Sequence, residues 1–430
     1  MNMAPQHTAG FRPTQDWLDD RPARPSGTVS LATQETIGSS QWVLELRDYV
    51  HEPALVGALR ELAAHSGGAN PFFEPEFLAA SVDRLGEGTK KLMILWEHVG
   101  DAAAARLAFP VIEDRVGLPA RRVLRAWSHP FAPLSTPLID QRDAEESCRR
   151  FAALLARLNL PGGLPLVFED LPAEDPLARP FAAALRAEGL AVLVADIRRR
   201  AGLPPHARLP VLEQRRRRKE LGRQFRRLSD LGHVEYEKAT DFESIIVRFE
   251  EFLLLETRGW KGRRGTSIYV IRKTASFARQ AVASLGDRGR AAIYSLRLDG
   301  HAIAALIVLR SGGRYYPWKI AFDEHYAAYS PGVQLLLHAS ADMIATEGFV
   351  YADSLAREHS WAERLWPDTI ALQTLVVAAA GAAPAAQRAA GAVARRAWLR
   401  RLARRLLRLD PPLEPPLEPP VEPARGSGGE

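Results

Sequence analysis

The pattern of apolar and polar positions divides most of the chain into two successive blocks, and each block mixes strands with helices. In the first block, apolar runs of strand length alternate with stretches that repeat apolar residues at helical spacing. The predicted strands lie at 42–46, 91–98, 104–112, 123–127, 166–169 and 191–197, and the predicted helices at 53–64, 144–158 and 176–188. Adjacent strands with interposed helices indicate a mixed sheet covered by helices.

The second block follows a turn-forming segment at 202–206 that contains two prolines. Asp299-Gly300 is a strong signal for a two-residue hairpin, so the strands on either side of it are predicted to pair antiparallel. The predicted strands lie at 233–237, 291–298, 302–310, 315–322 and 349–352, and the predicted helices at 210–231, 241–258, 267–285 and 331–346. The block therefore contains a three-stranded antiparallel meander that leads into a helix.

These patterns predict an α/β chain of α+β type with mixed sheets and two folded domains. The ends of the chain are rich in Pro, Gly and Ser and show no apolar periodicity, which is typical of disorder. We expect a disordered leader at 1–40, an N-terminal domain at 41–203, a C-terminal domain at 204–380, a basic amphipathic helix at 381–409 and a Pro-rich disordered tail at 410–430.

The charge and the cysteine content narrow the function classes. The formal net charge is +6, and the excess is concentrated in two basic segments, at 215–227 and 395–408. Such patches favour anionic partners: a phosphate-bearing cofactor, a nucleic acid or a membrane surface. The lone Cys148 offers neither an internal disulfide nor a metal framework. The start of the chain has no secretory pattern, so we expect a cytoplasmic protein.

The helix that follows the meander has a start suited to binding an anion. Unpaired backbone N–H groups and the helix dipole favour a phosphate there. Ser330 is a favoured N-cap residue, Pro331 a favoured first residue, and Gly332 allows close approach to the backbone. A merely well-capped helix is the alternative interpretation. The predicted cofactor-binding residues are Tyr329, Ser330, Pro331, Gly332, Val333 and Gln334.

Several segments together resemble the CelD-like family of GNAT-like acyltransferases, which is associated with cellulose biosynthesis and related in fold to the Fem-type aminoacyl transferases. The resemblance covers about 41–375 and rests on 256–262, 318–323, 329–332, 353–354 and, in the first block, 70–73 and 137–140. It implies a tandem, FemAB-like pair of GNAT folds with acyl-CoA as the donor. The usual GNAT phosphate-binding motif, Gln/Arg-x-x-Gly-x-Gly/Ala, is absent, and Ser-Pro-Gly occupies its place.

Acyl transfer to an amine needs a base, a polarised thioester carbonyl and a proton for the leaving thiolate. The candidate catalytic residues are Glu256, Lys319, Asp323 and Asp353, and the three carboxylates have salt-bridging roles as their alternative. Lys319 and Trp318 are consecutive in a strand, so we expect them to face opposite sides of the sheet. The candidate substrate-binding residues are Trp260, Lys261, Trp318 and His359. No metal-binding spacing of histidines occurs, so no metal is expected.

The two basic segments leave alternatives open. The segment at 215–227 contacts a CoA phosphate or a tRNA, or is a solvated helix face; Phe225 is its sole aromatic residue. In the second segment, Trp398, Leu399 and Leu402 share one side of a helix and arginines the other, which is typical of an interfacial helix at an anionic membrane. Docking of this helix onto its own domain is the other interpretation.

The main hypothesis is a cytoplasmic acyltransferase, with N-acetyltransferase-like chemistry, that moves an acyl group from acyl-CoA to an amine or hydroxyl acceptor. An acceptor used in envelope or exopolysaccharide biosynthesis, as a glycan precursor, suits the resemblance, and the second basic segment suits peripheral association with the inner face of the membrane. One alternative is Fem-type transfer from aminoacyl-tRNA. A catalytically silent GNAT-like scaffold at a membrane surface is another.

Overall fold

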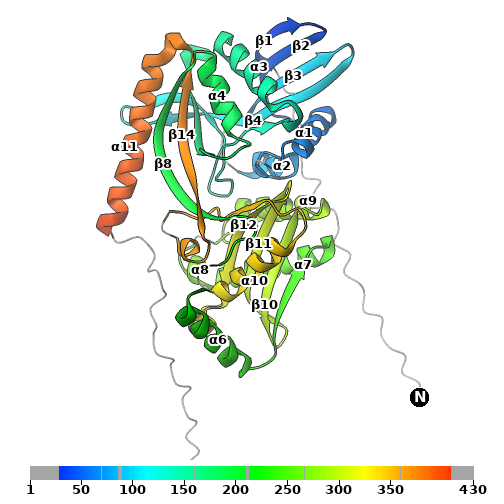
Figure 1. The fold of residues 1–430 in the computed structure, drawn as a ribbon, viewed down its shortest axis with the longest axis vertical. Coiled ribbons are helices and arrows are strands. Elements are labelled where there is room, and N and C mark those ends of the chain that lie inside the picture. Colours follow the sequence, from blue (N-terminus) through cyan, green and yellow to red (C-terminus); the bar gives the residue numbers. More distant parts are fainter. Residues whose placement is uncertain are drawn as a thin grey trace, which may run out of the picture.

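One mixed sheet runs through the molecule and joins the two halves of the chain (Figure 1). The computed structural model describes residues 29–407 except 69, 86–89, 159, 210–212, 266 and 359. The strand order is β1-β2-β3-β4-β5-β7-β14-β8-β13-β12-β11-β10-β9, and β6 pairs with β4. The predicted mixed α/β fold is therefore confirmed.

The N-terminal half begins with an antiparallel meander from β1 to β5, and β5 then pairs in parallel with β7. Its strands are β1 (Val29–Ile37), β2 (Ser40–Asp48), β3 (Lys91–Val99), β4 (Ala102–Val116), β5 (Arg121–Ala126), β6 (Leu138–Ile139), β7 (Leu166–Pro172) and β8 (Ala191–Leu203). Its helices are α1 (Pro53–His65), α2 (Pro75–Arg84), α3 (Ala144–Arg157) and α4 (Arg179–Ala187).

The C-terminal half repeats this order: an antiparallel meander from β9 to β12, a helix, and a strand, β13, that pairs in parallel with β12. Its strands are β9 (Val234–Ala239), β10 (Ala291–Leu298), β11 (His301–Ser311), β12 (Arg314–Phe322), β13 (Tyr351–Asp353) and β14 (Asp368–Ala378). Its helices are α6 (Arg215–Ser229), α7 (Phe242–Arg258), α8 (Trp260–Arg263), α9 (Arg272–Asp287), the 3₁₀ turn η4 (Glu324–Tyr329), α10 (Pro331–Ala345) and α11 (Ala383–Leu407).

The two halves exchange their last strands. β8 follows β7 in the chain but pairs with β13, whereas β14 follows β13 but pairs with β7. β8 and β14 also pair with each other along their length, and Figure 1 shows them side by side, running from the upper half of the molecule down to the lower half. The chain is therefore a tandem of two units of similar strand order whose sheets are continuous, and a boundary at 203/204 separates strands that are paired in space.

Helices cover both faces of the C-terminal sheet. On one face, Phe249 and Phe252 of α7 and Phe277 of α9 belong to the core that continues into the N-terminal half. On the other face, Leu335 and Met343 of α10 pack against the sheet in a second core, which α6 also joins. The start of α10 is thus held on the face opposite to the contact between the halves.

Residues 29–40 correct the expected extent of the disordered leader. Val29–Ile37 form β1, which pairs antiparallel with β2 through a turn at Gly38. The carboxylate of Glu35 pairs with Arg150 and Arg157 of α3, and this contact between distant residues holds the edge strand in place. A strand that is only half buried has weak apolar alternation, so its sequence resembled a linker.

Helix α11 docks onto its own sheet, which was one of the two interpretations of the C-terminal basic segment. Ala386, Ala389 and Val393 are buried against the strands of the N-terminal half, and Arg401 pairs with Asp196 of β8. Deleting the chain from 385 onward would therefore expose apolar sheet surface. No helix in the described part of the chain is both long and apolar enough to cross a membrane.

Candidate functional site

β12 and β13 pair only at the start of β12 in the described part of the chain. Arg314 pairs with Tyr351 and Tyr315 with Ala352, and beyond Tyr315 the two strands have no further pairing in the described residues. Where two parallel strands diverge, an extended polar chain can lie beside their backbone groups. The two strands diverge beyond Tyr315, and η4 and α10 follow the end of β12 directly.

A β-bulge in β12 changes the predicted orientation of Trp318 and Lys319. Ile307 of β11 pairs with Lys319 and Val308 pairs with Pro317, so Trp318 is the extra residue. Both side chains then lie on the face toward the N-terminal half: the Trp318 indole N–H donates to the carbonyl of Phe131 at 2.7 Å, and the Lys319 ammonium lies 4.6 Å from the Phe131 ring. The expectation of opposite faces is wrong because a bulge breaks the twofold alternation of a strand.

The start of α10 differs from an ordinary capped helix. Ser330 has φ 52° and ψ 48°, in the left-handed region, and its hydroxyl makes no capping hydrogen bond. Pro331 has no N–H, and the N–H groups of Gly332 and Val333 have no acceptor within the helix because they lie in its first turn. These backbone donors are suited to an anion. The Cβ position of Gly332 faces the Phe322 ring at 3.4 Å, so a large side chain there would collide with β12.

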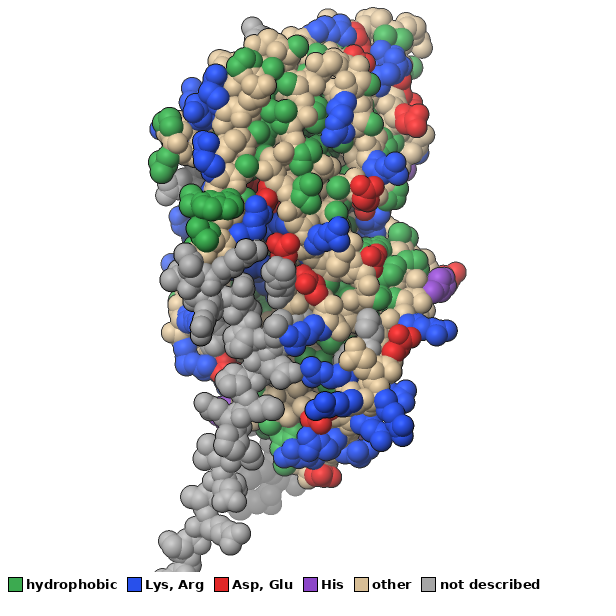
Figure 2. All heavy atoms as spheres, turned by 60° about the vertical axis from the view of Figure 1, so that its left-hand side comes forward, with side chains coloured by type: hydrophobic (Ala, Val, Ile, Leu, Met, Phe, Trp, Pro, Cys, Tyr) green, Lys and Arg blue, Asp and Glu red, His purple; other side chains and the backbone are tan. Residues whose placement is uncertain are grey.

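The basic helix α6 lies beside the start of α10. The Gln334 side chain donates to the carbonyl of Leu221 in α6 at 3.0 Å, and the guanidinium of Arg227 lies 5.7 Å from the Tyr329 ring. Figure 2 shows Lys and Arg side chains gathered low on the molecule, over the region of α6. The structure thus brings one of the two basic segments next to the predicted phosphate-binding turn.

The three candidate carboxylates have different surroundings. Glu256, near the end of α7, is buried and accepts the backbone N–H of Ile268 at 2.8 Å. Asp323 accepts the backbone N–H of His325 at 3.0 Å and so begins η4. Asp353 forms a buried ion pair with Arg200 of β8. Each contact is one that a structural carboxylate makes, and the catalytic role of each stays a prediction.

Three predicted substrate-binding side chains lie outside what the structure describes: those of Trp260, Lys261 and His359. The backbone of the first two belongs to α8, which is fastened to η4 through the ion pair of Arg263 with Glu324. Helix α8 therefore lies near the turn that leads into α10.

Sequence reasoning missed the contribution of the N-terminal half to this region. Trp127, His129 and Phe131 follow β5 at alternate positions, and their rings lie near one another, with centroids 5.1 Å apart for the first pair and 6.3 Å for the second. The rings contact α9 and β12 of the other half through Phe277 and Trp318. A short run of aromatic residues after a strand has no sequence signature, because its partners come from the second half.

Lysines lie at the two ends of this aromatic row, which we call the Trp127–Phe131 row. The residue Lys90 is only 5% exposed, and its ammonium group lies 5.1 Å from the Trp127 ring. The ammonium group of Lys319 lies over the Phe131 ring. Burial, together with the positive charges of Arg125, Lys319 and Lys90, lowers the pKa of His129 to about 3. The imidazole is therefore neutral at physiological pH in a positive surrounding.

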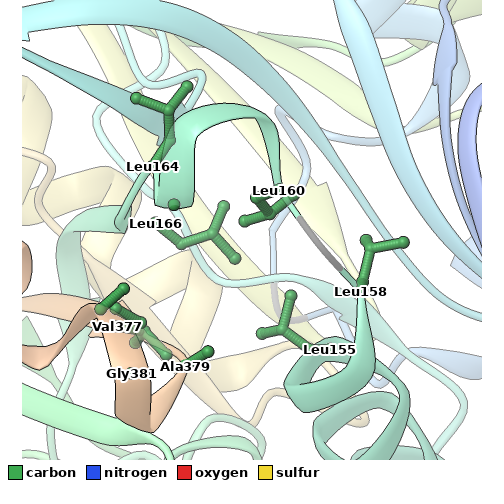
Figure 3. A pocket seen from close by; sticks show the side chains of 11 residues that line it. Leu155, Leu158, Leu160, Leu164, Leu166, Val377, Ala379 and Gly381 are labelled. Atoms are coloured by element: carbon green, nitrogen blue, oxygen red, sulfur yellow. The ribbon is translucent and has the colours of Figure 1, made fainter.

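An apolar cavity of about 270 Å³ lies in the N-terminal half (Figure 3). Leu155 and Leu158 at the end of α3 and Leu166 of β7 line it opposite Val377 of β14. Its lining contains only apolar residues, so no side chain there can bind a phosphate or move a proton. Separately, no cluster of three or more His, Cys, Asp or Glu side chains suited to a metal occurs among the described residues.

Comparison with known proteins bears on the C-terminal half. Residues 215–363 match the acetyltransferase (GNAT) domain family. The match covers about a third of the chain, from the start of α6 to the segment after β13, and so includes β12, η4 and α10. It supports a GNAT-type acyltransferase domain in this half. It does not show membership of the CelD-like family.

Among solved structures, FemX is similar at 10% identity, covering 76% of this chain and 96% of its own, with a TM-score of 0.47. A C-terminal DUF2156 domain from Agrobacterium fabrum is similar at 13% identity, covering 77% and 93%, with a TM-score of 0.45. A conserved protein from Bacteroides thetaiotaomicron is similar at 11% identity, covering 78% and 99%, with a TM-score of 0.44. Among curated proteins, none matches this sequence.

Proposed function

We propose that this protein transfers an acyl group from acyl-CoA to an amine or hydroxyl acceptor, with the donor bound along β12 and at the start of α10. The observation that carries the proposal is the divergence of β13 from β12 beyond Tyr315, within a segment that matches the GNAT domain family. Diverging strands suit the extended pantetheine arm, and the first turn of α10 suits its pyrophosphate. Arg227 lies within reach of the same turn.

The chemistry that this arrangement serves is direct transfer. The acceptor nitrogen or oxygen attacks the thioester carbonyl, a C–N or C–O bond forms, and the C–S bond breaks. The proton lost by the acceptor passes to a base or to water, and the CoA thiolate takes up a proton. Glu256, Asp323 and Asp353 remain the candidate carboxylates for the base, and Lys319 of β12 is a candidate for stabilising charge.

The protein is proposed to act in the cytoplasm, on an acceptor of envelope or exopolysaccharide assembly, as the CelD-like resemblance implies. Calorimetric titration with acetyl-CoA, followed by detection of free CoA thiol in the presence of amine acceptors, tests the donor half of this proposal. Saturable binding and acceptor-dependent thiol release are expected. Absence of binding by acetyl-CoA and by longer acyl-CoAs would instead favour a catalytically silent scaffold.

Aminoacyl-tRNA as the donor is a second candidate, and one observation favours it. Phe225 of α6 stacks on Tyr236 of β9, and Tyr236 stacks on His338 of α10 with ring centroids 3.9 Å apart. Aromatic rings beside a basic helix are a common feature of surfaces that bind single-stranded RNA. Salt-sensitive tRNA binding that is lost when Arg215–Arg218 are replaced by glutamine would support this donor.

Peripheral membrane association is a separate proposal that rests on α11. Trp398 and Leu399 are 57% and 56% exposed, and the exposed Arg395 and Arg396 precede them. An apolar pair beside basic residues suits the interface of an anionic membrane. Sedimentation with anionic vesicles that is weakened by salt and by Trp398→Ala is the expected result.

A further inference from the structure

The apolar cavity of about 270 Å³ lies where α3, β7 and the end of β14 meet (Figure 3). Leu155, Leu158 and Leu166 line one side, and each is 5% exposed or less. Smaller residues line the opposite side, among them Val377 of β14 and Ala379 directly after it. The cavity exists because these small side chains do not fill the space in front of the leucines.

The rim of the cavity reaches the surface of the molecule. It is formed by small residues that are half-buried or exposed: Gly163, Ala379, Gly381 and Ala382. They belong to the 3₁₀ turn η3 (Pro161–Gly163) and to the connection from β14 to α11, which contains the turn η6 (Ala380–Ala382). Short turns, rather than a helix or a strand, therefore separate the buried leucines from solvent.

The interior of the cavity suits an apolar molecule better than water. The lining residues are all apolar, and the backbone at the rim bonds within its own turns. The N–H of Gly163 donates to the carbonyl of Leu160 at 2.9 Å, and the N–H of Ala382 donates to that of Ala379 at 2.8 Å. A buried water needs several polar partners, whereas an apolar cavity of about 150 Å³ stays dry and takes up benzene. An apolar occupant would supply the contacts that the leucines lack.

The cavity lies far from the proposed donor site, at the other end of β14. Asp368, the first residue of β14, pairs with Gly202, which also pairs with Asp353 of β13. The cavity borders Val377 and Ala378 at the end of β14, so about ten residues of extended strand, roughly 30 Å, separate the two places. About 30 Å is the hydrocarbon thickness of a whole bilayer, which takes two lipid tails to span. The acyl chain of a donor bound at β12 therefore does not fill this cavity.

We propose that the cavity binds the alkyl chain of an amphiphile, a medium-chain fatty acid or alcohol, at a site of its own in the N-terminal half. The chain packs against the leucines, and the polar head stays at the rim in solvent. The volume limits the chain to roughly nine methylene groups, because each takes about as much room as a water molecule in the liquid, about 30 Å³. The inference goes beyond the proposed acyltransferase function and does not depend on it.

A series of straight-chain alcohols tests the site on the full-length protein. Calorimetric titrations with 1-butanol, 1-hexanol, 1-octanol and 1-decanol measure the affinity for each chain. We expect the affinity to rise about fourfold per added methylene group, as burial of apolar surface predicts, and to level off once the chain fills the cavity. Octanoate in place of 1-octanol distinguishes a fatty acid from a neutral lipid. Absence of binding by the whole series, or an affinity that is independent of chain length, would overturn the inference.

Variants at two consecutive positions assign the binding to the cavity. Ala379→Phe places a ring in the cavity and is expected to weaken 1-octanol binding at least about tenfold, because the ring fills space that the chain needs. Ala380→Phe is the matched control, since Ala380 is exposed and lies outside the lining, and it should bind like the wild type. Leu158→Ala enlarges the cavity and should move the levelling point to a longer chain. Unchanged binding by Ala379→Phe would contradict the assignment.

A titration of 1-octanol into protein saturated with acetyl-CoA separates this site from the donor site. We expect the affinity for 1-octanol to be the same with and without acetyl-CoA. Displacement of 1-octanol by acetyl-CoA would contradict a separate site. If acetyl-CoA does not bind at all while 1-octanol binds with the expected dependence on chain length, the proposed acyltransferase function fails and this inference stands.

Discussion

Arg200 of β8 and Asp353 of β13 form an ion pair that is almost completely buried, with side-chain exposures of 1% and 7%. The pair joins a strand from each half, because β8 belongs to the N-terminal half and pairs with β13. Asp353 also accepts the backbone N–H of Leu355 at 2.9 Å, and Arg200 donates to the carbonyl of Pro133. The pair thus fixes the place where β13 separates from β12.

Asp353→Asn is expected to destabilise the protein, because it leaves the Arg200 guanidinium buried without its counter-charge. The loss of a buried partner costs about 3–5 kcal/mol in the free energy of unfolding, measured by urea denaturation. The double variant Arg200→Met/Asp353→Leu is the control and should recover much of this loss. Near-normal stability with transfer reduced by about 10²–10⁴-fold would show instead that Asp353 is the base.

Val333→Glu is expected to weaken acetyl-CoA binding by at least about tenfold, through repulsion of the pyrophosphate at the start of α10. An acidic residue in the first turn favours the helix itself, so a loss of binding would not reflect melting of the helix. Val333→Gln, which loses the same packing without adding charge, is the matched control. Calorimetry measures both affinities, and equal values for the two variants would remove the first turn of α10 from the donor site.

Ser330→Gly is expected to stabilise the protein slightly, by about 0.5–1 kcal/mol, since glycine adopts the left-handed conformation of this position without steric cost. Ser330→Ala should cost much less than the roughly 1 kcal/mol typical of a lost N-cap hydroxyl, because the hydroxyl does not cap. Thermal unfolding measures both. A large loss in the Ala variant together with destabilisation by Gly would contradict the left-handed conformation.

The depressed pKa of His129 predicts a specific loss of stability in acid. The native pKa is about 3, below the ordinary value near 6.5, so in this range the unfolded state binds the proton that the native state excludes. The free energy of unfolding should therefore be unaffected above about pH 7 and fall between pH 6.5 and 3, by at most about 1.4 kcal/mol per pH unit from this residue. Urea unfolding at pH 7.5 and pH 5 measures the change.

His129→Gln is the control for this pH dependence, since glutamine keeps a polar side chain that does not titrate. The variant should lose less stability than the wild type between the two pH values. Equal losses would mean that the native pKa of His129 is not lowered relative to its pKa in the unfolded chain.

Much of the fold follows from local pattern. The meander on either side of Asp299-Gly300 is predicted correctly because both residues have positive φ, as the hairpin turn requires. The exchange of β8 and β14 has no local signal, since it depends on pairing between residues far apart in the chain, such as Ala191 with Ala378. The half-buried β1 was missed because its alternation is weak.

The candidate site, like the fold, could be predicted from local sequence only in part. The start of α10 was predictable because helix starts have signature residues. The shared face of Trp318 and Lys319 was not, because a bulge is set by the neighbouring strand. The aromatic row at Trp127 to Phe131 was missed for a related reason. Its lysines and rings meet only when the two halves pack together.

The central claim is that the end of β12, beyond Tyr315, and the first turn of α10 bind the acyl donor. Amide hydrogen exchange with and without saturating acetyl-CoA tests it most directly, because the claim concerns backbone N–H groups. We expect the donor to slow exchange in peptides that cover 316–322 and 332–334, with little change in β2 and β3 of the distant meander. Binding of acetyl-CoA without protection of either peptide would contradict the assignment.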